Sequence, residues 1–121
     1  MRSITRFPPI EHAAGTDLTL GIGLFADNGD TLEIVGGMSA AWKLYRAVPR
    51  RGRKPFKGNP VLEKTSAAGG VTLTDGNAAV AIAAADLAGK SGVFWQTLAV
   101  TDAGGDVACY GQGEVLIRAA A

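Results

Sequence analysis

Residues 16–25 read Thr16-Asp17-Leu18-Thr19-Leu20-Gly21-Ile22-Gly23-Leu24-Phe25, and this segment sets the class of fold. Every second residue from Leu18 to Leu24 is aliphatic, and threonine or glycine stands between them. A period of two places the aliphatic side chains on one side of an extended backbone and the small ones on the other. The segment therefore predicts a β-strand with one face buried and the other in water.

Further segments of this kind follow along the chain, separated by residues that favour turns. We expect strands at residues 31–35, 38–47, 61–66, 71–73, 78–84, 92–101 and 107–118. Aspartate, asparagine and glycine at 27–30, 75–76 and 102–106 suit tight turns, and Phe94, Leu98 and Val100 are expected to point inward. Short strands with turns about every 8–12 residues predict an all-β antiparallel sandwich of about seven or eight strands.

Two segments leave local alternatives open. The alanine-rich residues 78–88 suit a helix by propensity, but the alternation of larger aliphatic residues within them favours a strand. Asp86 is expected to start a single helical or 3₁₀ turn over residues 86–89 and to cap its free backbone N–H groups. Gly111 and Gly113 predict a bulge or bend in the last strand.

The composition fits one folded domain. The chain has 121 residues, of which 47% are hydrophobic and 19% charged, so a packed core is possible, although 17 glycines make it thin. We expect an extended arm at 1–15, a sandwich at 16–118 with a long loop at 48–60, and a tail at 119–121. A single cysteine excludes an intrachain disulfide. Because residues 1–10 lack the apolar core of a signal peptide, we expect synthesis in a cytoplasm without one, and no membrane span.

Three apolar residues in the arm and one tryptophan are candidate contact residues. Ile4, Phe7 and Ile10 are costly to expose, so the arm is expected to dock onto either this domain or a neighbour. Trp95 alternates with the inward residues of its strand and is expected to point outward, as contact residues do.

A basic segment is the sharpest feature of the sequence. The net charge is only +1, but five of the twelve basic residues fall within eight positions, and the rest of the chain is mildly acidic. The residues are Arg50, Arg51, Arg53, Lys54, Phe56 and Lys57. They predict a solvated loop or a contact with an acidic protein surface, weighed equally, and both are favoured over contact with nucleic acid.

No constellation for catalysis, cofactor binding or metal binding is predicted. His12 stands alone and is expected to be solvated, and Cys109 is expected to be a small buried hydrophobe. The aspartates at 27–30 and 102–106 lie in turns, where they serve backbone hydrogen bonds. The glycine pairs at 21–23 and 111–113 open no helix, so they are not phosphate loops.

The order of motifs in the second half carries a resemblance. The motifs are 60–66 (PVLEKTS), 70–76 (GVTLTDG), 80–82 (VAI), 86–89 (DLAG), 92–95 (GVFW), 100–105 (VTDAGG) and 113–115 (GEV). This order resembles small immunoglobulin-like virion proteins of tailed phages and prophages, and is similar in particular to the amino-terminal domain of phage baseplate upper proteins. The similarity covers about residues 16–118, and the arm and the basic loop depart from the pattern.

The resemblance implies an immunoglobulin-like structural protein that multimerises and binds other virion proteins, with no catalytic residues. Its place would be the tail, the baseplate, a fibre attachment or a head decoration. One alternative is a carbohydrate- or surface-binding adhesion module, in which Trp95, Tyr45 and Tyr110 form a platform for sugar stacking. Another is a nucleic-acid-binding domain that uses the basic segment, and an enzyme is the least favoured class.

Overall fold

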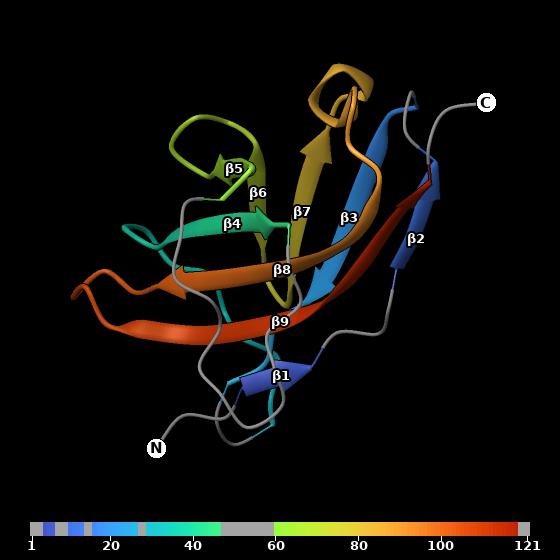
Figure 1. Ribbon diagram of the computed structural model, residues 1–121. Helices are drawn as coiled ribbons and strands as arrows, with labels where there is room; N and C mark the ends of the chain where they lie inside the picture. Colours follow the sequence, from blue (N-terminus) through green and yellow to red (C-terminus); the bar gives the residue numbers. More distant parts are fainter. Residues whose placement is uncertain (1–3, 7–9, 14–15, 27–28, 47–59, 119–121) are drawn as a thin grey trace.

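The computed structural model describes residues 4–6, 10–13, 16–26, 29–46 and 60–118, and these residues form strands and one short helix (Figure 1). The elements are β1 (Ile4–Arg6), β2 (Ile10–Ala13), β3 (Leu18–Gly23), β4 (Ser39–Tyr45), β5 (Leu62–Thr65), β6 (Val71–Thr74), β7 (Asn77–Ile82), η1 (Ala84–Leu87), β8 (Gly92–Thr101) and β9 (Val107–Arg118).

The strands form two sheets that pack face to face, so the predicted all-β sandwich is confirmed. The large sheet has the order β5–β4–β8–β9, with β1 and β2 both paired to the outer side of β9, and the small sheet has the order β3–β7–β6. The chain passes between the sheets after β2, β3, β5 and β7. This is the connectivity of immunoglobulin-like sandwiches. Figure 1 shows β8 and β9 crossing over the strands of the small sheet.

The core lies between the sheets and follows the alternation of the sequence. Trp42 on β4 pairs with Leu98 on β8, and both are almost fully buried. Phe94, Leu98 and Val100 point inward as predicted, and Cys109 joins the core as the small buried residue that was expected. One inward residue was not expected. Gln96 stands between Phe94 and Leu98 on β8 and is fully buried.

Three details of the predicted strands are wrong. Residues 31–35 form only an isolated bridge, because the Leu32 backbone bonds to Leu24 and Gly76 while the Ile34 N–H donates to the Asp75 carboxylate at 2.8 Å. These bonds tie the segment to the β6–β7 turn instead of to a partner strand. The arm adds β1 and β2, which pair with β9 in parallel, so the sandwich has more strands than expected and is not purely antiparallel.

The third error concerns the last strand. Gly111 and Gly113 pair in regular register with Leu98 and Gln96, and the irregularity falls instead between Val100 and Thr101 of β8. Aspartate and glycine form the β8–β9 turn at residues 102–106, and the Asp102 carboxylate bonds its backbone. The register therefore shifts next to this turn and is regular where Gly111 and Gly113 lie.

The alanine-rich region resolves as a strand followed by a short turn. Residues 77–82 are β7, and the predicted single turn is a 3₁₀ helix that begins at Ala84, two residues before the predicted start. The Asp86 carboxylate accepts a hydrogen bond of 2.9 Å from the N–H of Ala83, the residue before η1. Asp86 therefore caps the helix from a position inside it and not from the position that precedes it.

Candidate functional site

Three of the ten predicted contact residues lie within the described part of the chain. Ile4 is on β1, opposite Tyr110 of β9, and Ile10 on β2 packs against the core. The described part of the arm therefore docks onto its own domain, which was one of the two expected outcomes. Trp95 is on β8. Phe7, Arg50, Arg51, Arg53, Lys54, Phe56 and Lys57 lie outside the described residues.

Trp95 lies on the outer face of the large sheet, in the predicted register, but its side chain is not exposed. It pairs with Tyr45 and Glu114, and only 5% of its surface is accessible. The indole N–H donates to the Gln112 amide oxygen at 3.2 Å. The expectation of an outward contact residue is therefore wrong for Trp95, because neighbouring groups cover the ring, and the proposed sugar-stacking platform loses its main surface.

The other two members of that platform lie on the same face. Tyr45 and Tyr110 are half-buried. Burial raises the pKa of the Tyr110 hydroxyl, the nearby Tyr45 adds to this effect, and a hydrogen bond with Thr97 opposes it. The Tyr110 hydroxyl therefore stays protonated at neutral pH and can serve as a hydrogen-bond group.

The residues examined for chemistry have structural partners. His12 Nε2 is bonded to the Thr16 hydroxyl at 2.9 Å and to the Thr16 carbonyl at 3.0 Å. Asp102 accepts hydrogen bonds from the Gly104 and Asp106 N–H groups at 2.9 and 3.0 Å, which is the turn role predicted for it. Within the described residues, no group of three or more histidines, cysteines, aspartates or glutamates is arranged to hold a metal ion.

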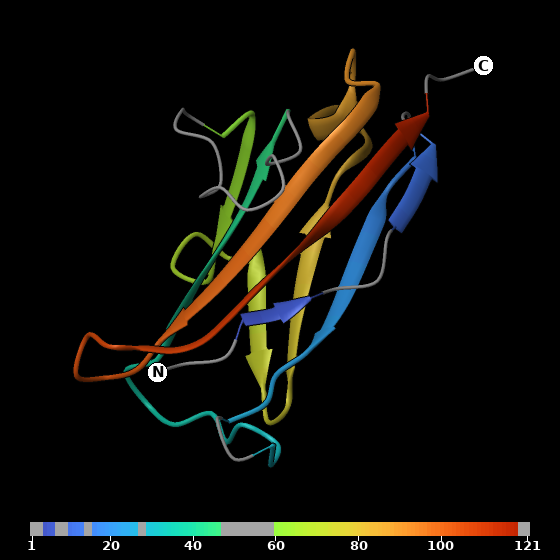
Figure 2. The same ribbon diagram turned by 60° about the horizontal axis from the view of Figure 1, so that its bottom comes forward.

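One end of the sandwich is acidic. Three connections meet there: the chain between β3 and β4, the β6–β7 turn and the β8–β9 turn (Figure 2). Hydrogen bonds of 3.0 Å from the Leu24 N–H to the Gly76 carbonyl and of 2.8 Å from the Gly76 N–H to the Leu32 carbonyl hold two of them together. The described part of these connections carries five carboxylates and no lysine or arginine. We call it the acidic end, with Asp30, Glu33, Asp75, Asp102 and Asp106.

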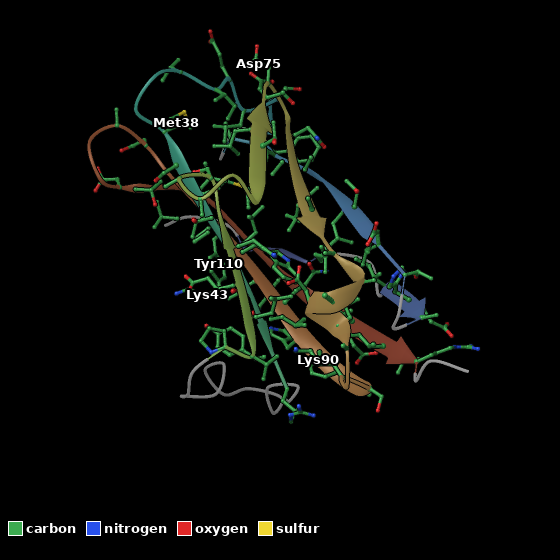
Figure 3. The ribbon with its side chains drawn as sticks, turned by 90° about the horizontal axis from the view of Figure 1, so that it is seen from above. Met38, Lys43, Asp75, Lys90 and Tyr110 are labelled. Carbon is green, nitrogen blue, oxygen red and sulfur yellow. The ribbon has the colours of Figure 1, made fainter. Side chains whose placement is uncertain are left out.

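The opposite end of the sandwich has mixed charge. Lys64 forms an ion pair of 2.7 Å with Asp86, and the Arg46 guanidinium lies 5.3 Å from the centre of the Phe94 ring. β4 starts beside the acidic end and runs away from it, and β5 starts beside the end of β4, so Arg46 and Pro60 both lie at this opposite end. Figure 3 shows Asp75 toward one end of the molecule and Lys90 toward the other.

The solvent-facing side of the small sheet is built from small uncharged side chains. We call it the small-sheet face. Strand register places on it Thr19, Gly21 and Gly23 of β3, Asn77, Ala79 and Ala81 of β7, and Thr72 and Thr74 of β6. The outer face of the large sheet, in contrast, carries Lys43, Glu63 and Glu114.

A shallow hollow lies at the η1 end of this face. Its volume is about 290 Å³, and its lining residues are Asp17, Leu18, Thr19, Lys64, Ala81, Ile82, Ala83 and Asp86. The Asp17 carboxylate accepts a hydrogen bond of 2.8 Å from the Ala84 N–H, so it ties the start of β3 to η1 across the hollow. Hydrogen bonding to Lys64, followed by the Ala83 N–H, lowers the pKa of Asp86, so the ion pair at the rim is charged at neutral pH.

Comparison with known proteins adds no relative. No model of a known protein family matches the chain, and no curated protein sequence matches it. In the described residues, no helix has the length and apolar character needed to cross a membrane.

Two features that the fold brings together were not predicted from the sequence. The acidic end unites residues 30–33, 75 and 102–106, which are far apart in the sequence, so only the order of the strands reveals it. The small-sheet face had a local signal, because threonine and glycine alternate with aliphatic residues along β3. Phe25 was taken as the end of that strand, although its side chain is 51% exposed.

Proposed function

We propose that this chain is a structural protein of a tailed-phage or prophage virion that works by assembling with other protein chains and performs no catalysis. Its place would be the tail, the baseplate, a fibre attachment or a head decoration. The order of sequence motifs at residues 60–115 supports the virion part of the proposal, and the gathering of carboxylates at the acidic end supports the assembly part.

The acidic end carries the argument. It bears five carboxylates, and the described part of its three connections contains no lysine or arginine. The sequence also holds five basic residues within segment 47–59. Opposite charges on two approaching surfaces raise the rate of encounter and fix the relative orientation of the partners. A body with unlike ends is suited to contacts in which one surface meets a different surface of the next subunit, and such contacts build rings and filaments.

Particle purification tests the proposal directly. Virions from an induced or infected culture are purified, and the chain is sought by mass spectrometry and located by electron microscopy with a labelled antibody. We expect a fixed copy number per particle. A chain that stays free and monomeric throughout infection would contradict the proposal.

Charge reversal tests the assembly part. The double variant Glu33→Lys, Asp106→Lys alters the acidic end, and Glu63→Lys, Glu114→Lys makes the same change of charge on the outer face of the large sheet. We expect the first variant to lose incorporation by at least about tenfold, as removal of steering charges does, and the second to be retained. Equal incorporation of both variants would show that the acidic end has no role.

A further inference from the structure

We draw no further inference here: the strongest candidate, the small-sheet face with the exposed Phe25 ring at one end and the hollow lined by Asp17, Lys64 and Asp86 at the other, is an unpartnered sheet surface, and nothing in the structure shows what covers it.

Discussion

Replacing Trp42 by phenylalanine should unbalance the buried polar pair at the centre of the sandwich. The indole N–H donates to the Gln96 amide oxygen at 2.8 Å, and both side chains are almost fully buried. The Gln96 amide nitrogen has no partner among the described residues. The substitution removes the indole donor, so the amide oxygen becomes unpaired as well.

The expected cost follows from two effects. An unpaired buried polar atom costs about 1–3 kcal/mol, and the smaller ring leaves a gap worth about 1 kcal/mol. Trp42→Phe should therefore lower the free energy of unfolding by about 2–4 kcal/mol. With a dependence of about 2 kcal/mol per molar urea, the unfolding midpoint falls by about 1–2 M.

A second substitution isolates the polar part of this cost. Gln96→Leu, added to Trp42→Phe, removes both unpaired atoms of the amide and should recover about 1–3 kcal/mol, because replacing both partners of a buried hydrogen bond is close to neutral. The assay is urea unfolding of the single and double variants followed by circular dichroism.

The control for this cycle is Ile117→Val combined with Trp42→Phe. Ile117 is six residues along β9 from the partner of Leu98, about 20 Å away, so the two effects should add. If Gln96→Leu and Trp42→Phe also add without coupling, the buried hydrogen bond is not what stabilises this part of the core.

Asp86→Asn should destabilise the fold by about 1 kcal/mol at pH 7, the range for a capping residue or ion pair. The hydrogen bond to Lys64 holds the Asp86 pKa below the ordinary 3.8, so this stability is present above pH 3.8 and is lost as the pH falls through the folded pKa. The unfolding free energies of the wild type and Asp86→Asn should therefore converge in acid. Gly76→Ala should lower the free energy of unfolding in urea by about 2–4 kcal/mol, because Gly76 has a positive φ of 74° and the new methyl group would clash with Thr31. Gly105→Ala should cost only about 1 kcal/mol, because Gly105 has a positive φ of 91° but its new methyl group would meet no neighbour. Absorbance titration should show one tyrosine that ionises above the ordinary pKa of 10.0, and Tyr110→Phe should remove it.

Three results would contradict these expectations. A constant difference between wild type and Asp86→Asn from neutral to acid pH would show that the ion pair does not stabilise the fold. Equal costs at Gly76 and Gly105 would mean that the close approach at the β6–β7 turn is unimportant. Ionisation of both tyrosines together near the ordinary value would place Tyr110 in water.

Much of the fold could be predicted because the alternation of residues in β3, β8 and β9 depends only on which face is buried. The bounds of β8 and β9 were predicted to the residue, and Gly92, Asp102 and Asp106 mark three of the four ends. Residues 31–35 have the same alternation but no partner strand, and the carboxylate of Asp75 takes one of their donors. Local pattern cannot show which partner a backbone group finds.

The candidate surfaces were harder to predict than the fold. Trp95 was predicted on the correct face of the sheet. Its exposure, however, depends on neighbours such as Gln112, which is distant in the sequence. The acidic end is a product of strand order, and the small-sheet face requires the register of β3 with β7. Charge composition alone indicated a basic segment and could not show that carboxylates from three connections gather at one end of the sandwich.

The parallel pairing of β1 and β2 with β9 bears on how the chain stays in solution. β9 has 12 residues, and without these two short partners its backbone N–H and C=O groups would form a long open border. Such a border recruits strands from other molecules and leads to aggregates. The first residues of the chain therefore seal the sheet on that side, and a version shortened to begin at β3 should precipitate even though its core is complete.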